Sequence, residues 1–187
     1  MGKTQYVLDA KSSKFTVQAF AEGLAGIADH RPTFFVREFS GEMEFDPDKL
    51  DAGSLHLTAK TRSLAIMDEV TQLDRKAIER VMFGEVLQSD RFPDVAFRST
   101  RVACKAVGDN RYRADITGTM LLHGVENLES MQAQLTMNVG SLRAHGEFRL
   151  RQTDYDLAIA SVAGGLLRIK NELKFVFYFV APKQNGA

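Results

Sequence analysis

Residues 111–122 read RYRADITGTMLL, and apolar or small side chains alternate with mostly polar ones along the whole segment. Successive side chains of a β-strand point to opposite faces, so a period of two predicts a strand with one face in the core. Tyr112, Ile116 and Met120 fall on the apolar face. This alternation is typical of antiparallel strands that keep one face in water.

The same period recurs on both sides of this segment and predicts eight strands in all. They lie near residues 15–21, 34–45, 55–60, 95–100, 111–122, 131–139, 142–150 and 173–180. Turn-forming segments such as VGDNR (107–111) and HGVEN (123–127) separate several of them. Eight antiparallel strands with one apolar face either close into a barrel or stack as a sandwich, and closure removes exposed strand edges.

One segment breaks the period of two. From residue 68 to residue 87, apolar side chains recur at spacings of three and four, which predicts an amphipathic helix. Asp68 and Glu69 suit the start of this helix, and Gly84 favours its end. We therefore expect a single all-β domain over residues 1–187, with one helix inserted between strands 3 and 4.

Composition excludes several classes of protein. The chain has 187 residues, and its 24 Lys and Arg balance 24 Asp and Glu, which argues against nucleic-acid binding. The single cysteine, Cys104, rules out an intrachain disulfide and a cysteine-rich metal site. No apolar run approaches 18 residues, so we expect no stable membrane insertion. The N-terminal residues carry no apolar signal segment, which predicts a cytoplasmic protein.

Motifs for catalysis or cofactor binding are absent from the sequence. It contains no GxGxxG, GxxxxGK[ST], GxSxG or HExxH. The four histidines do not stand at metal-ligand spacing; they are His30, His56, His123 and His145. Paired carboxylates fall in turns, where they bond their own backbone. We expect no catalytic residue, no metal and no cofactor.

Two polar residues are less ordinary. Arg37 falls on the apolar face of its predicted strand, between Phe35 and Phe39, and a buried guanidinium is costly unless it is paired. Either Arg37 lies in water at an open rim, or it meets an acid or a ligand headgroup. His30 lies in the loop before that strand, where it is either solvated or bonded to the same headgroup.

Six segments, in this order along the chain, resemble the YceI-like family. They are YVLDAKSSKFTVQA (6–19), FSGEMEFDPD (39–48), DRFPDVAFRST (90–100), ITGTMLLHGVE (116–126), GEFRLRQTDYDL (146–157) and ELKFVFYFVA (172–181). The resemblance runs from about Tyr6 to Ala181. It implies a lipocalin-like antiparallel barrel with a long apolar tunnel that holds a polyisoprenoid or a similar amphiphilic chain.

Individual positions carry the resemblance and its limits. The residues that match family motifs are Tyr6, Asp9, Ser13, Gly41, Phe45, Phe92, Pro93, Gly118, Gly124 and Asp154. Gln152 stands where an Arg is usual, and Asp156 stands where a Gly is usual. The lack of a leader makes the chain similar to a leaderless branch of the family.

We therefore expect an eight-stranded antiparallel lipocalin-like barrel that acts as a non-catalytic carrier. Small inward residues leave volume for a polyisoprenoid, quinone-like or fatty chain. Burying about ten methylenes contributes roughly 8 kcal/mol before the costs of association. The residues expected to bind the ligand are Phe15, Val17, His30, Phe35, Arg37, Phe39, Leu57, Phe97, Met120, Leu122, Leu135, Met137, Phe148, Phe175 and Phe177.

Two other functions stay open from the sequence. The protein is an enzyme that uses the same cavity with His30 as acid or base, or it is a stress-linked interaction module whose barrel is filled by its own side chains. An outward apolar face would then suit a homodimer. The residues expected on that face are Phe34, Val36, Val176, Tyr178 and Val180.

Overall fold

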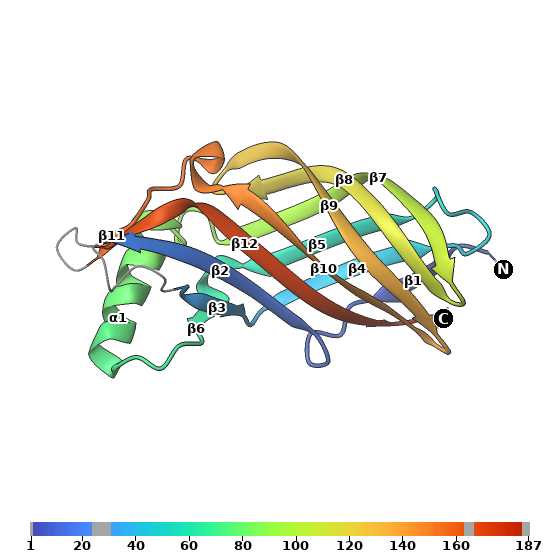
Figure 1. The fold of residues 1–187 in the computed structure, drawn as a ribbon, viewed down its shortest axis with the longest axis horizontal. Helices are drawn as coiled ribbons and strands as arrows, with labels where there is room; N and C mark the ends of the chain where they lie inside the picture. Colours follow the sequence, from blue (N-terminus) through green and yellow to red (C-terminus); the bar gives the residue numbers. More distant parts are fainter. Residues whose placement is uncertain (1, 24–30, 163–166, 185–187) are drawn as a thin grey trace.

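The computed structural model describes residues 2–23, 31–162 and 167–184, and over these residues the strands form one twelve-stranded antiparallel sheet. The sheet curls strongly, as a half-barrel, around an apolar interior (Figure 1). Along the sheet the order is β1-β4-β5-β7-β8-β9-β10-β12-β2-β3-β6, with β11 paired to β12. The strands are β1 (Thr4–Val7), β2 (Lys14–Gly23), β3 (Thr33–Val36), β4 (Phe39–Phe45), β5 (Ser54–Lys60), β6 (Leu64–Ile66), β7 (Asp94–Gly108), β8 (Arg111–Leu122), β9 (Val125–Asn138), β10 (Ser141–Arg151), β11 (Ser161–Val162) and β12 (Leu167–Pro182).

The long strands confirm the alternation that predicted them. Along β8, every second side chain from Tyr112 to Leu122 is buried, and the others are exposed or half-buried. The β8–β9 connection is a two-residue hairpin turn at His123 and Gly124, whose φ angles of 54° and 77° are both positive. This turn geometry matches the right-handed twist of the flanking strands, so it fixes their register.

The prediction of eight strands is wrong in number, partly because some strands are very short. β1, β6 and β11 have four, three and two residues, and so few residues show no clear period. β1 nevertheless joins the two ends of the chain. Tyr6 bridges Lys183, and the Gln184 amide donates to the Gln5 carbonyl at 2.9 Å. These bonds hold the first strand against the last residues of the sheet.

The predicted strand 34–45 is in fact two strands, separated by a two-residue break at Arg37. β3 pairs with β2 and β6, whereas β4 pairs with β1 and β5. Because the chain changes partners at the break, its side-chain alternation does not continue across it. Phe35 pairs with Thr16 in a row that points away from the interior, and Lys14 Nζ lies 5.6 Å from the centre of its ring. The prediction that Phe35 and Arg37 share an inward face with Phe39 is therefore wrong, and Arg37 is exposed.

The same change of phase corrects the expected outward apolar face. Val36 is buried in the core, with 7% of its surface exposed. Phe34 pairs with the inward Val17 and so lies on the inner row as well. Val176 and Tyr178 are exposed on the outer face of β12, as predicted. The homodimer itself stays a prediction.

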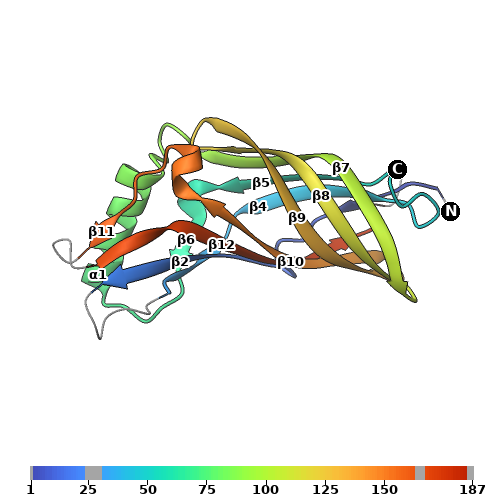
Figure 2. The same cartoon turned by 45° about the horizontal axis from the view of Figure 1, so that its top comes forward.

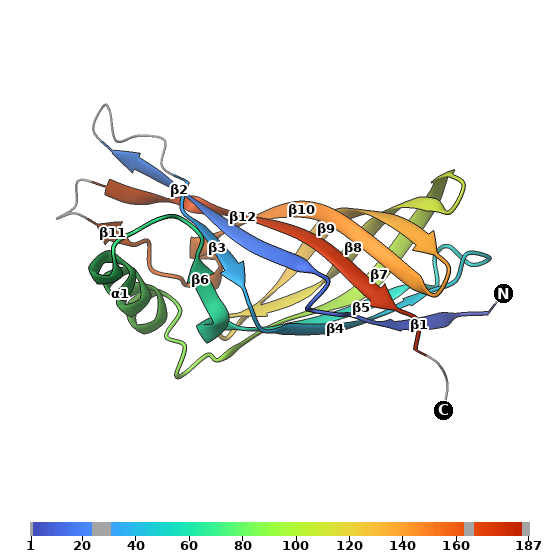
Figure 3. The same ribbon diagram turned by 90° about the horizontal axis from the view of Figure 1, so that it is seen from below.

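The predicted helix is confirmed between the third and fourth predicted strands, with tighter bounds than residues 68–87. It consists of α1 (Gln72–Arg80), which continues into a wider π-helical segment, η2 (Val81–Val86). The Thr71 hydroxyl oxygen accepts the Asp74 amide at 3.1 Å and caps the helix N-terminus. The helix lies at the end of the curled sheet opposite the chain termini, next to β6 and β11 (Figures 1 and 3). Within the described residues, no helix combines the length and the apolarity that crossing a bilayer requires.

Two glycines of the sheet, Gly118 and Gly146, let the neighbouring strands approach closely and leave no free space beside them. A Cβ at Gly118 would lie 2.4 Å from the Arg98 carbonyl oxygen and 2.6 Å from the Phe97 ring. A Cβ at Gly146 would likewise lie 2.4 Å from the Gln132 carbonyl oxygen. The expectation that small inward residues leave volume is therefore wrong at Gly118 and Gly146, because neighbouring strands already occupy the space.

Candidate functional site

The inside of the curled sheet contains an apolar cavity of about 70 Å³. Its walls come from β2, β4, β5, β7, β8, β9, β10 and β12, so every long strand contributes inward side chains. An apolar cavity of about 150 Å³ is large enough to bind benzene. The cavity is about half that size, so a longer apolar ligand must displace side chains to enter it.

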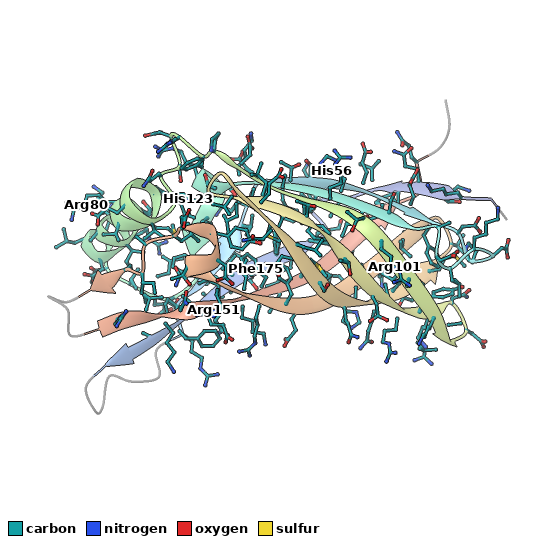
Figure 4. The ribbon with its side chains drawn as sticks, turned by 90° about the horizontal axis from the view of Figure 1, so that it is seen from above. His56, Arg80, Arg101, His123, Arg151 and Phe175 are labelled. Carbon is teal, nitrogen blue, oxygen red and sulfur yellow. The ribbon has the colours of Figure 1, made fainter. Side chains whose placement is uncertain are left out.

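Phenylalanine rings occupy much of one side of this interior. Phe15, Phe39 and Phe179 form a triangle, in which the Phe15 ring centre lies 5.7 Å from each of the others and the Phe39 and Phe179 ring centres lie 5.8 Å apart. The Phe15 ring plane is nearly perpendicular to both. The Phe148 ring stacks on Phe175 with its centre at 4.7 Å. Figure 4 shows Phe175 inside the curl of the sheet. Edge-to-face and stacked rings attract one another beyond their burial, so this cluster is a specific arrangement.

Small side chains also line the cavity. Ala114 on β8, Ala133 on β9 and Ala144 on β10 are buried and line the cavity on neighbouring strands. Ala114 pairs with Ala133, and Ala144 pairs with Leu135 on one side and Phe179 on the other. A band of alanines leaves the free volume that larger side chains would fill.

Polar groups are scarce around the cavity. Among the described residues that line it, only Glu44 and Ser54 carry polar side chains. The Glu44 carboxylate accepts the Ser54 hydroxyl at 2.6 Å and pairs with Lys3 Nζ at 2.6 Å. The hydrogen bond from Lys3, and to a smaller extent the one from Ser54, lower the pKa of Glu44. Its carboxylate therefore stays ionised at neutral pH. Glu44 is therefore not poised to donate a proton.

The structure brings most of the expected binding residues together. The expected residues that line the cavity are Phe15, Leu57, Phe97, Met120, Leu135, Phe148, Phe175 and Phe177. Val17 and Phe39 pack against the same core without bordering the cavity. Leu122 and Met137 also join the core, near opposite ends of the interior.

Three expected residues are not placed in the apolar interior at all. Phe35 and Arg37 lie outside it, for the reason given with β3 and β4. His30 lies outside the described residues.

Other residues that were not among the expected binding residues also line the cavity. They include Met43, Phe45, Ala59, Ile116, Met131 and Phe179. Each of them falls on the apolar face of an alternating run, so the period of two was a signal that could have found them. Alternation alone does not say which inward side chains border free space.

A short helical turn, η3 (Gln152–Tyr155), directly follows β10. Tyr155 is fully buried, and its hydroxyl donates to Glu129 Oε1 at 2.7 Å. Burial, and next the bond to Glu129, raise the pKa of Tyr155 far above its usual value. His123 Nδ1 lies 3.2 Å from the Tyr155 carbonyl oxygen, so this turn is tied to the β8–β9 hairpin.

The family model for the YceI-like domain matches residues 6–181 of this chain, which is nearly its whole length. The chain belongs to the YceI-like family. A curated relative is the UPF0312 protein VPA0850 of Vibrio parahaemolyticus serotype O3:K6 (strain RIMD 2210633). It is 25% identical over 163 residues, which cover 82% of this chain and 78% of that protein.

Solved structures share the YceI-like fold at low sequence identity. Burkholderia cenocepacia BcnA superposes with a TM-score of 0.73 at 18% identity, over 93% of this chain and 99% of that one. A polyisoprenoid binding domain from Saccharophagus degradans, implicated in plant cell wall breakdown, gives a TM-score of 0.68 at 16% identity. That match covers 96% of this chain and 98% of the Saccharophagus domain. Both likenesses establish the fold.

Proposed function

We propose that this protein is a non-catalytic binding protein that holds a long apolar chain inside its curled sheet. The observation that carries the proposal is the cavity, whose described walls are almost entirely aliphatic and aromatic. The chain is a polyisoprenoid, a quinone-like tail or a fatty chain, because such ligands need apolar surface rather than polar partners. The Saccharophagus domain, which has the same fold, is a polyisoprenoid binding domain and supports this direction.

The cavity must widen when the chain enters, because its volume is only about 70 Å³. Met43, Met120 and Met131 line it, and unbranched thioether side chains adapt readily to new shapes. The bonds from β1 to Lys183 and Gln184, just after β12, tie these two parts of the sheet together at that end. Binding therefore rearranges side chains within a fixed wall.

Chain length gives a direct test. We expect the Kd of 1-alkanols, measured by calorimetry on delipidated protein, to fall about fourfold for each added methylene until the interior is full. Each methylene buried in an apolar site contributes about 0.8 kcal/mol, which sets this ratio. A Kd that does not change between octanol and hexadecanol, or no binding at all, would contradict the proposal.

The small volume favours one other candidate, an interaction module whose interior is filled by its own side chains. In that case the Phe15–Phe39–Phe179 cluster is simply a packed core. The alkanol series separates the two candidates, because a filled interior takes up none of the chains.

A further inference from the structure

The wall of the curled sheet is interrupted between β9 and β10. These strands pair from Asn138–Ser141 to Gln132–Glu147, and their pairing stops there. Beyond that point, β9 continues as the partner of β8, and β10 continues as the partner of β12. Both strands are fully described here, and they diverge toward the end that carries η3 (Figure 2).

The turn η3 lies at the end of this interruption and is bonded to β9 on one side and β12 on the other. Tyr155 donates to Glu129 on β9, and the Asn127 amide donates to the Asp154 carbonyl oxygen at 2.6 Å. On the other side, Gln152 Nε2 donates to the Lys170 carbonyl oxygen of β12 at 2.8 Å. We call the opening between Glu129–Gln132 of β9 and Glu147–Leu150 of β10 the β9–β10 window. It measures roughly 10 Å along the strands, at about 3.3 Å per residue.

A surface groove of about 350 Å³ lies at this window. Its rim is polar and includes Gln132, Glu147 and Arg149, which are exposed. The groove shares Ile116, Met131 and Phe148 with the wall of the internal cavity. At the window, β9 and β10 are not paired, so these three side chains are what separates the groove from the interior.

We infer that an apolar chain enters and leaves the interior sideways through the β9–β10 window, by displacement of Met131 and Phe148. This inference rests on the proposed function. Where β9 pairs with β8 or β10, a lateral route would have to break backbone hydrogen bonds, whereas the window requires only side chains to move. Met131 is flexible, and Phe148 is half-buried with its ring stacked on Phe175.

A removable bridge across the window tests this route. We would combine Ser130→Cys with Arg149→Cys and join the two thiols with a short bis-methanethiosulfonate, which a reductant removes again. The matched control joins Gln134→Cys to His145→Cys, exposed partners on the same strands where the wall is already paired. Cys104 is buried, and burial raises the pKa of its thiol, so it reacts slowly; unmutated protein is treated in parallel.

Stopped-flow fluorescence with cis-parinaric acid gives the association and dissociation rates. We expect the bridge at the window to slow both rates at least tenfold, to leave Kd within twofold, and to be reversed by the reductant. The control bridge leaves both rates unchanged. Tyr155→Phe removes the bond to Glu129 and so weakens the attachment of η3 to β9 beside the window. We expect both rates to rise severalfold at nearly constant Kd.

The outcomes separate the route from the proposed function. If cis-parinaric acid binds normally and the bridged window exchanges it at the unbridged rate, the chain enters elsewhere and the inference is wrong. If slowing is equal in the control bridge, the window has no special role and the inference is also wrong. If the unmutated protein binds no cis-parinaric acid, the proposed function and the inference fail together.

Discussion

Ala144→Leu should fill the internal cavity and thereby stabilise the empty protein while it abolishes binding. Ala144 is buried on β10, borders the cavity, and lies between Leu135 and Phe179. The free energy of unfolding changes by about 24 cal/mol for each Å³ of cavity volume. A volume of about 70 Å³ therefore corresponds to a gain of up to about 1.7 kcal/mol. For a domain of this size, each kcal/mol raises Tm by about 2–4 °C.

The assay compares urea unfolding and binding on the same delipidated samples. The expected result is a free energy of unfolding that is unchanged or higher, together with loss of 1-alkanol and cis-parinaric acid binding. Ala106→Leu, at an exposed position on β7, is the matched control and should leave binding intact. If Ala144→Leu costs more than about 2 kcal/mol, the site is already close-packed. If it binds the ligands as the unmutated protein does, the cavity is not their site. Either result would refute the reasoning.

Three other changes have defined outcomes. Gly118→Ala should lower the free energy of unfolding by about 1–3 kcal/mol or more, because its Cβ would meet the Arg98 carbonyl at 2.4 Å; equal stability in urea would mean that the strands can separate locally. Gly84→Ala, where nothing lies within 4 Å, should raise that free energy by about 0.5–1 kcal/mol, and a loss would show an unseen contact. Folding raises the pKa of Tyr155, so its protonated hydroxyl contributes fully to the free energy of unfolding below about pH 10. As the pH rises further, this contribution falls by up to about 1.4 kcal/mol per pH unit. Unfolding in urea between pH 9 and 11 should show a shallower decline in Tyr155→Phe than in the unmutated protein, and identical slopes would place the effect on other groups.

Strands long enough to repeat their pattern could be predicted from the sequence. β8 and β10 show apolar alternation over eleven or more residues, and the helical spacing before β7 identified α1. β6, with three residues, has no detectable period. Its place in the sheet depends on pairing with β3, which is a contact between segments distant in sequence.

The residues that line the cavity could be predicted only as one face of each strand, and only while the strand stayed in the sheet. Phe97 and Met120, which alternation predicts on the inward face, line the cavity because their strands are regular. Phe35 was misplaced because the chain leaves the sheet at Arg37 and joins new partners, and local alternation carries no sign of that change. The β9–β10 window could not be predicted for the same reason. The alternation of β10 continues past the residue where its pairing with β9 stops.

The most direct test of binding in the interior is native mass spectrometry of the protein as purified from cells, followed by organic extraction and lipid analysis. We expect a bound apolar molecule of defined mass, which extraction recovers from the unmutated protein and which is missing from Ala144→Leu. A bare protein mass in both, with no uptake of added polyprenyl or fatty chains, would contradict the account and favour a filled interior.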